Sequence, residues 1–253
     1  MPEKNSKEFK LAAIKQLLIT SIFLLFQIII FFVSAGYITN QRPWLYFITT
    51  FINYIVGTAI QYKLNPQLVV QRLKAKRKGS KLWDEILMRT SNLMIIIAVP
   101  AVAGFDVSRF QWSSIDIYFA PLGLVFVVVS SIILNYAMIV NIHFEPTVRI
   151  QEERNHKVIT RGPYSIIRHP GYLAGILFAI SIPLLIGSFF SFIPVCIYIF
   201  LMIIRTWLED KTLQKELEGY IGYSKQVRYR LFPGIWWRSA FFFFIEVFYR
   251  LQC

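Results

Sequence analysis

Long uncharged, apolar stretches alternate with short charged segments along almost the whole chain. A helix that crosses a bilayer needs about 20 mostly apolar residues, and most of these stretches reach that length. The stretch 90–105 reaches it when residues 86–89 are added. The pattern therefore predicts helices that span a membrane. The uncharged stretches are residues 16–41, 43–62, 90–105, 117–142 and 170–204.

The last stretch is too long for one helix. Gly187-Ser188 lies near its middle and predicts a tight turn between two helices at about 171–187 and 189–208, with kinks at Pro183 and Pro194. The prediction is then six membrane-spanning helices in all. The composition agrees, because 56% of the 253 residues are hydrophobic and only 16% are charged, against about 25% charged in a soluble domain. We expect an all-α fold, a polytopic membrane helical bundle, and exclude an ordinary soluble globule.

The formal net charge of +13 is distributed unevenly over the predicted loops. If six helices alternate in direction, one side of the membrane holds only Arg42 and Arg109, which leaves 27 − 2 = 25 Lys and Arg residues for the other side. The positive-inside rule then places both termini in the cytoplasm, which in a prokaryote makes this a multi-pass protein of the plasma membrane. The basic cluster between Arg72 and Lys81 is typical of an anchor on anionic lipid headgroups, so no nucleic acid is implied. The aromatic tail 235–251 also carries charges and is predicted to lie on the membrane as an interfacial helix.

Two cysteines, Cys196 and Cys253, do not make a disulfide framework, and no Cys/His cluster has the spacing of a metal site. We therefore predict no metal. The chemistry is expected instead in residues 145–170, a charged segment too polar for lipid that lies between the fourth and fifth helices. Pro170 begins the fifth helix there, and the free N–H groups of a helix start attract a carboxylate or a phosphate.

A second group of charges stands where the sixth helix leaves the membrane. Arg205 and Glu209 are four residues apart and share one helix face, which Leu213 continues. A solvent-facing ion pair is one interpretation. An arginine followed by Glu209 and Asp210 at the end of an apolar helix is costly, however, unless something polar lies between the helices. The basic, aromatic stretch 220–233 downstream is able to fold back over such a site.

At these residues the sequence resembles a known family. The pattern G-P-Y-x-x-x-R-H-P-x-Y at 162–172, then R-x-x-x-E-[DE]-x-x-L at 205–213 and Y-x-x-Y at 220–223, is similar to that of the integral-membrane methyltransferases related to isoprenylcysteine carboxyl methyltransferase. These proteins, like the phospholipid N-methyltransferases, use S-adenosylmethionine. The resemblance covers about 148–236 and fits a prokaryotic branch of the family. It divides the chain into N-terminal transmembrane helices, 1–144, and a catalytic region, 145–253, which comprises a cofactor loop, a helical hairpin and C-terminal interfacial helices.

The resemblance implies roles for particular residues. Arg205 matches the arginine that faces the methyl acceptor, and Glu209 matches the acidic residue that contacts the cofactor. Gln151 matches a cofactor-contacting glutamine, although its spacing to His156 is shorter here, and Asp210 stands where many relatives have a second Glu. The remaining implied cofactor-binding residues are His156, Lys157, Val158, Ile159, Tyr164, His169, Pro170, Gly171 and Tyr172.

This assignment fits the chemistry of S-adenosylmethionine, which presents a carboxylate, a ribose, an adenine ring and a sulfonium cation. The start of a helix, the Glu209 carboxylate and aromatic faces, among them Trp207 at the substrate side, offer complementary groups. Arg205 would hold a carboxylate acceptor by paired hydrogen bonds without a general base. An amine acceptor would need a base, for which His169 and Glu209 are the candidates. The expected acceptor is a lipophilic molecule, either a lipid acid such as an isoprenylcysteine or a phospholipid amine.

The sequence leaves two other hypotheses about function open. The scaffold also resembles that of the NADPH-dependent sterol reductases, although the Gly-Pro-Tyr and Arg-x-x-x-Glu-Asp spacing follows the methyltransferases. A non-enzymatic membrane protein, such as a transporter, is the second. Transporters commonly carry internal repeats and ionised residues near the bilayer midplane, whereas here only Arg89, near a helix end, is charged within the predicted spans. No G-x-G-x-x-G is present, which argues against a soluble Rossmann-type methyltransferase.

Overall fold

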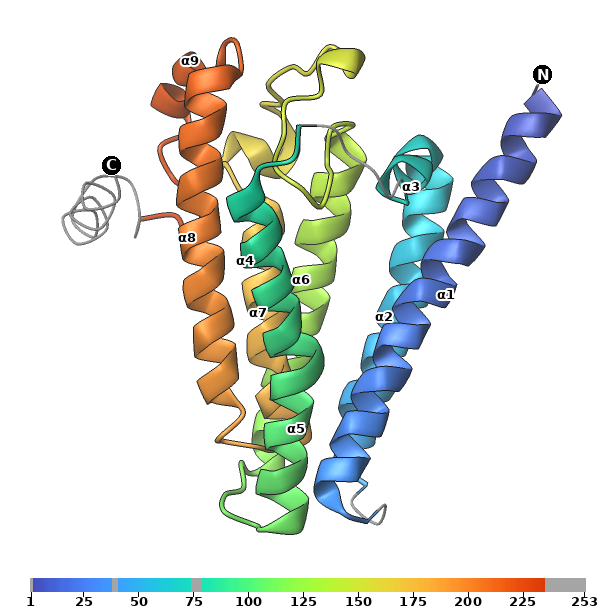
Figure 1. The fold of residues 1–253 in the computed structure, drawn as a ribbon, viewed down its shortest axis with the longest axis vertical. Coiled ribbons are helices and arrows are strands. Elements are labelled where there is room, and N and C mark those ends of the chain that lie inside the picture. Colours follow the sequence, from blue (N-terminus) through green and yellow to red (C-terminus); the bar gives the residue numbers. More distant parts are fainter. Residues whose placement is uncertain (1, 38–40, 74–78, 235–253) are drawn as a thin grey trace.

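A computed structural model of the chain describes residues 2–37, 41–73 and 79–234, and it is an all-α helical bundle (Figure 1). In these ranges the backbone forms helices and connecting loops, and the single β-type pairing is an isolated bridge between Ile167 and Tyr229. The α-helices are α1 (Pro2–Ala35), α2 (Pro43–Leu64), α3 (Pro66–Arg72), α4 (Leu82–Leu93), α5 (Val99–Gly104), α6 (Ala120–Val140), α7 (Pro170–Ile186), α8 (Phe192–Glu216) and α9 (Tyr220–Gln226). Short π-helical turns η1 (Met94–Ala98) and η2 (Phe105–Arg109) and 3-10 turns η3 (Ile117–Phe119), η4 (Glu152–Arg154) and η5 (Gly162–Ser165) complete the set.

Six long helical segments correspond to the six predicted spans. Five of them are long and apolar enough to cross a membrane, and α7, with 17 residues, is shorter. Eleven of the 17 residues of α7 are buried, because this helix packs against α6, α8 and α2. A helix enclosed in this way needs less contact with lipid than one at the rim of the bundle, which is consistent with its short length.

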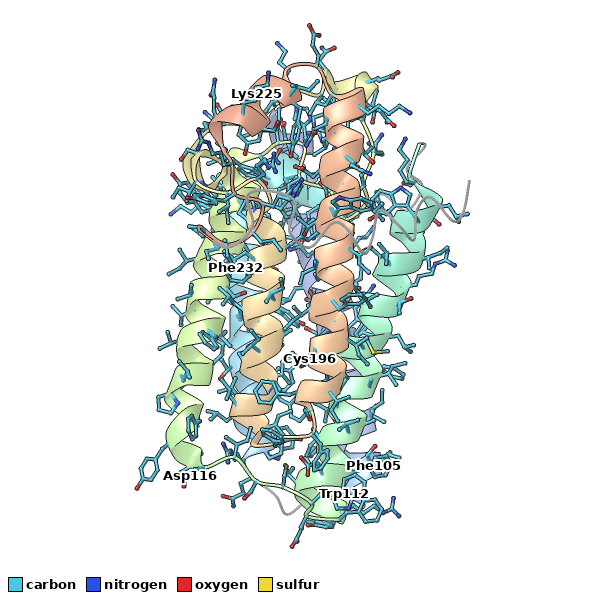
Figure 2. The ribbon with its side chains drawn as sticks, turned by 90° about the vertical axis from the view of Figure 1, so that its left-hand side faces the viewer. Phe105, Trp112, Asp116, Cys196, Lys225 and Phe232 are labelled. Carbon is cyan, nitrogen blue, oxygen red and sulfur yellow. The ribbon has the colours of Figure 1, made fainter. Side chains whose placement is uncertain are left out.

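Successive helices run in opposite directions, as predicted, so that the polar segments divide between two ends of the bundle. The N-terminus, α3, the loop 141–169 and α9 share one end, and the turn between α7 and α8 lies at the other (Figure 1). Figure 2 separates Lys225 at the first end from Trp112 and Asp116 at the second. The two motif segments therefore lie at the same end of the bundle. The cytoplasmic placement of that end stays a prediction.

The third span departs from its predicted limits. It is one continuous segment, Leu82–Arg109, built from α4, η1, α5 and η2. Two aspartates, Asp84 and Asp106, lie within it and are fully buried, so the expectation that Arg89 is the sole charged residue in the spans is wrong. Both carboxylates are tolerated because each accepts hydrogen bonds from other elements.

Close packing and buried polar contacts hold the helices together. Gly104 in α5 lies directly against α1, where a Cβ at this position would clash with the Phe31 carbonyl oxygen. Gln61 of α2 donates a hydrogen bond to Asn135 of α6 and accepts one from Gln16 of α1, at 3.0 and 2.9 Å. Small residues and interhelical hydrogen bonds of this kind favour association where apolar burial alone gives no preference among helices.

The turn between α7 and α8 forms where Gly187-Ser188 predicted it. Gly187 has a left-handed backbone, with φ of +92°, and Arg42 donates to the Leu184 and Leu185 carbonyl groups that end α7. Pro183 lies inside α7 as expected, whereas the kink predicted at Pro194 is wrong. Pro194 falls in the first turn of α8, where no intrahelical hydrogen bond is lost.

The predicted interfacial tail, 235–251, and part of the basic cluster, 74–78, lie outside the described residues.

Candidate active site

A cavity of about 360 Å³ is lined by residues of both motif segments. The loop 141–169, the first turn of α7, one face of α8 and the helix α9 form most of its wall. The structure thus brings together residues that are far apart in the sequence. Of the predicted site residues, it places Gln151, His156, Lys157, Val158, Ile159, Tyr164, His169, Pro170, Gly171, Tyr172, Arg205 and Glu209 on the wall of this one cavity.

Hydrogen bonds within the loop 141–169 fix its path around the cavity. Asn141, just after α6, donates from Nδ2 to the Tyr164 hydroxyl at 3.0 Å. The almost fully buried Gln151 donates to the carbonyl oxygen of His143 at 2.7 Å. The segment 156–159 has no regular secondary structure and pairs with no strand in the described part of the chain. Its backbone groups are consequently not used in a sheet.

Two imidazole rings pack together in this loop, with the ring centroids of His143 and His156 4.4 Å apart. Both side chains act as acceptors, because Lys157 N–H donates to His143 Nε2 and Gln151 N–H donates to His156 Nδ1, each at 3.4 Å. Burial lowers the pKa of His156 to about 4, and repulsion from His143, Arg149 and Arg154 adds to the effect. Burial also lowers the pKa of His143. The pair is therefore neutral at pH 7.

The start of α7 is shaped by a turn and by a close contact. Gly162 begins the 3-10 turn η5 with φ of +62°, and Pro170 is the first residue of α7. Gly171 lies under the ring of Phe144, where a Cβ would come within 2.8 Å of the aromatic carbon atoms. The helix start is thus held against the loop, and both line the cavity.

One face of α8 presents a cation and a carboxylate to the same cavity. Arg205 and Glu209 are one turn apart, and Leu213 continues the face, as the spacing predicted. Glu209 Oε2 accepts a short hydrogen bond from the Tyr172 hydroxyl of α7. The guanidinium of Arg205 lies over the Tyr172 ring, 5.0 Å from its centroid. Tyr172 therefore contacts both charged groups.

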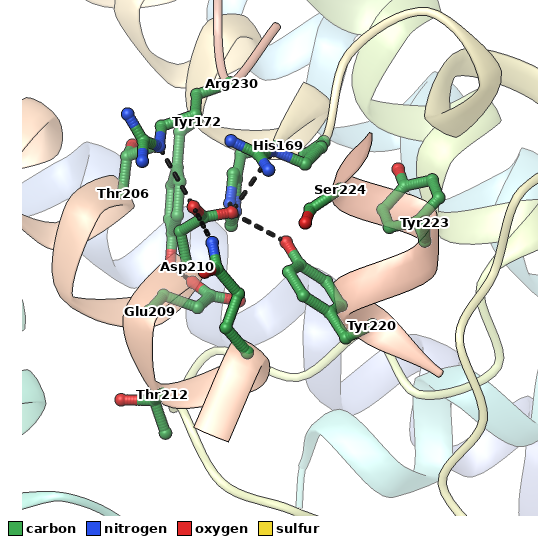
Figure 3. A network of polar contacts seen from close by, with 12 residues as sticks. His169, Tyr172, Thr206, Glu209, Asp210, Thr212, Tyr220, Tyr223, Ser224 and Arg230 are labelled. Carbon is green, nitrogen blue, oxygen red and sulfur yellow. Dashed lines mark hydrogen bonds and ion pairs between the residues drawn. The ribbon is translucent and has the colours of Figure 1, made fainter. Parts of the chain in front are cut away.

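Asp210, one residue further, is fully buried at the centre of a polar network (Figure 3). Its Oδ1 accepts from the Tyr220 hydroxyl at 2.9 Å and lies 3.4 Å from His169 Nε2. Its Oδ2 accepts from Arg230 Nε at 3.0 Å, and Arg168 Nε lies 3.2 Å from Oδ1. One carboxylate thus joins α8, the start of α7, α9 and the segment after α9.

The segment after α9 folds back along the first motif, as the sequence predicted. Arg168 N–H and His169 N–H donate to the carbonyl oxygen atoms of Tyr229 and Arg230, both at 3.0 Å. These bonds accompany the parallel bridge between Ile167 and Tyr229. Leu231 is fully buried beneath them. The last described residues are therefore part of the structure that supports the cavity.

A sequence comparison identifies part of this site. A model of the isoprenylcysteine carboxyl methyltransferase (ICMT) family matches residues 123–215. Residues 123–215 are therefore ICMT-like. Two rice proteins, from Oryza sativa subsp. indica and subsp. japonica, are each described as a "Probable protein-S-isoprenylcysteine O-methyltransferase". Each is 37% identical to this chain over 60 residues.

Those 60 residues are 23% of this chain and 31% of each rice protein, so the chain spans less than a third of the curated relatives it matches. The ICMT-like segment supplies the loop 141–169, α7 and the Arg205–Glu209 face of α8. The cavity wall also includes Arg72 of α3 and Met88 and Ser91 of α4, which precede the segment. The N-terminal helices thus contribute directly to the site.

The structure does not bring Trp207 to the cavity wall, and two buried residues near the cavity were not predicted from the sequence. Trp207 does not line the cavity, because it is two positions from Arg205 on the helix; its buried ring lies 4.1 Å from Lys211 Nζ. His143 was missed, although it is the third histidine of the chain and lies beside the first motif segment. Asp84 was missed as well; an acidic residue before an apolar run was its one visible signal.

The lowered pKa of His156 predicts a loss of stability in acid. Above pH 6.5 the imidazole is neutral in both the folded and the unfolded chain, and its full contribution to stability is present. As the pH falls from 6.5 towards 4, the unfolded chain binds a proton here that the folded chain excludes, so the fold loses stability. We expect the thermal unfolding midpoint in detergent to fall over this range, and to fall less in His156→Asn. Equal slopes for the two proteins would contradict this assignment.

Proposed function

We propose that this protein is an integral-membrane, S-adenosylmethionine-dependent methyltransferase that esterifies a carboxylate on a lipophilic acceptor. The observation that carries the proposal is the single cavity on which the two motif segments meet, with Arg205 and Glu209 on consecutive turns of one helix face. The ICMT-like segment contains both of these residues. The names of the two rice relatives suggest an isoprenylcysteine carboxylate as one acceptor of this class.

The cavity has groups that suit S-adenosylmethionine. Its volume of about 360 Å³ lies in the range of small-molecule sites. Three buried polar atoms on its wall, Ser91 Oγ, His143 Nδ1 and Thr147 Oγ1, have no hydrogen-bond partner among the described residues. Polar atoms buried without a partner are costly, which supports a polar ligand that would satisfy them.

Several residues would hold the cofactor. Glu209 uses Oε2 for Tyr172, and among the described residues no donor reaches its Oε1, which leaves that oxygen for a hydroxyl or a cation of the cofactor. In the first turn of α7 the N–H groups of Tyr172 and Leu173 donate to the His169 carbonyl oxygen, so the Gly171 N–H would be the donor to a carboxylate. Tyr164 would offer an aromatic face. S-adenosylmethionine supplies a methyl group activated on a sulfonium cation.

Arg205 would bind and orient the acceptor carboxylate, which is already ionised at neutral pH and needs no general base. The two candidate bases for an amine acceptor are both engaged: His169 Nε2 faces Asp210, and Glu209 accepts from Tyr172. This favours O-methylation over N-methylation of a phospholipid amine. Met88, Leu134 and Met202 supply an apolar part of the wall for the hydrophobic portion of the acceptor.

The proposed topology has this end of the bundle in the cytoplasm, where S-adenosylmethionine is available, while the acceptor enters from the bilayer. The basic residues collect at this end, and the positive-inside rule supports that orientation.

Isothermal titration calorimetry of the purified protein in detergent tests the proposal. We expect binding of S-adenosylmethionine and S-adenosylhomocysteine, no binding of NADPH, and at least tenfold weaker cofactor binding in Glu209→Gln. Glu218→Gln, an exposed position beyond α8, serves as the matched control and should bind as the wild type does. Binding of NADPH without S-adenosylhomocysteine would overturn the proposal in favour of a reductase. Binding of neither would remove the enzymatic proposal altogether.

A further inference from the structure

We propose that Asp84 of α4 is a positioning residue that holds the Arg205 guanidinium in the orientation required to bind the acceptor. The inference rests on the proposed function, in which Arg205 binds an acceptor carboxylate. It extends the functional machinery to a helix that precedes the ICMT-like segment.

The contacts of Asp84 use both of its carboxylate oxygens. Oδ1 accepts from Arg205 Nε at 2.6 Å, and Oδ2 accepts from the backbone N–H of Val148 at 2.8 Å. The side chain is fully buried. Asp84 therefore joins α4 to α8 and, through Val148, to the loop that lines the cavity.

The guanidinium of Arg205 is fixed from three directions. Asp84 binds Nε, the Pro146 carbonyl oxygen accepts from Nη2 at 2.5 Å, and the Tyr172 ring lies against the guanidinium. Nη1 has no acceptor in the described part of the chain, although Arg205 lines the cavity. A guanidinium is a planar fork with five donors, so fixing Nε and Nη2 also fixes the direction of the remaining donors.

The alternative partner of Arg205 explains why this constraint matters for function. Glu209 lies one turn further along the same face, a spacing at which arginine and glutamate pair readily on a helix. Such a pair would withdraw the cation from the acceptor and the carboxylate from the cofactor. Asp84 supplies a competing carboxylate from another helix and so keeps the two functional charges apart.

Asp84→Asn separates a positioning role from a purely structural one. The asparagine is nearly the same size and still accepts a hydrogen bond, but it lacks the charge that holds the guanidinium. Asp84→Glu keeps the charge at a longer reach. Glu85→Gln is the matched control, since Glu85 is the next residue on α4 and pairs at 3.5 Å with the exposed Arg89.

The assay uses N-acetyl-S-farnesylcysteine as acceptor and methyl-labelled S-adenosylmethionine, with calorimetric binding of S-adenosylhomocysteine measured on the same preparations. For Asp84→Asn we expect about a 100-fold fall in kcat/KM for the acceptor, because small displacements of a positioning group have effects of this size. The Kd of S-adenosylhomocysteine should change less than about threefold, a difference that corresponds to under 0.7 kcal/mol. Asp84→Glu should recover part of the loss, and Glu85→Gln should match the wild type.

Wild-type kinetics in Asp84→Asn would overturn the inference. A parallel loss of acceptor turnover and S-adenosylhomocysteine binding would also overturn it, because that result assigns Asp84 to the fold as a whole. Failure of the proposed function gives a different pattern, in which the wild-type protein itself binds no S-adenosylhomocysteine, and the role of Asp84 then fails with it.

Discussion

Replacing Asp210 by alanine is expected to lower the free energy of unfolding by about 3–5 kcal/mol, as removal of one partner from a buried ion pair typically does. The change would leave three cationic or protonatable groups, Arg168, His169 and Arg230, next to one another without their shared carboxylate. It would also remove the acceptor of the Tyr220 hydroxyl. The measurement is unfolding in mixed detergent micelles, followed by circular dichroism.

Glu216→Ala on the same helix is the matched control. Glu216 pairs with Lys81 at 2.8 Å, but both side chains are about one-third exposed, and pairs that reach solvent contribute about 1 kcal/mol or less. Asp210→Asn should fall between the two variants, because it retains hydrogen-bond acceptance without the charge. Equal stabilities for Asp210→Ala and Glu216→Ala would show that the network is not a source of stability.

Arg205→Lys is expected to lower kcat/KM for a carboxylate acceptor by about 100- to 1000-fold, the range seen when a preorganised donor is removed from an active site. Lysine keeps the positive charge near Asp84 but lacks the planar fork that binds a carboxylate through two parallel hydrogen bonds. The Kd of S-adenosylhomocysteine should remain within about threefold of the wild-type value. Label transfer to N-acetyl-S-farnesylcysteine and calorimetry measure the two quantities.

Arg89→Lys tests the same chemical change at an exposed position, since the Arg89 side chain is 82% exposed. We expect wild-type kinetics there. If Arg205→Lys weakened S-adenosylhomocysteine binding as strongly as it reduced turnover, Arg205 would have to be assigned to the cofactor or to the fold.

Most of the fold could be predicted from the sequence, because each membrane helix is determined by a local run of residues. An apolar run of sufficient length gives a helix, and Gly187 ends one because it adopts the left-handed backbone that closes the hairpin. The spacing of Arg205 and Glu209 likewise determines that they share a face. The same spacing rule explains why Trp207 lies off the cavity wall, because residues two apart on a helix do not face the same way.

The part of the site that could not be predicted from the sequence depends on contacts between distant segments. Asp84 and Arg205 are 121 residues apart, and no local pattern pairs them. Asp84 also interrupts the apolar run from which the limits of the third span were predicted. For this reason the predicted helix began at residue 86, whereas α4 begins at Leu82. Similarly, the role of Asp210 is determined by Arg230 and Tyr220, which reach it only when the segment after α8 folds back.

The pairing of Ile167 with Tyr229 imposes an order on the maturation of this protein. The long helices of the described chain and the whole loop 141–169 all precede residue 229 in the sequence. The start of α7 acquires its backbone partners, and Asp210 its Arg230, only after that residue has left the ribosome. Membrane insertion and formation of the binding site are therefore separable, and released chains truncated before residue 229 should be inserted yet unable to bind S-adenosylhomocysteine.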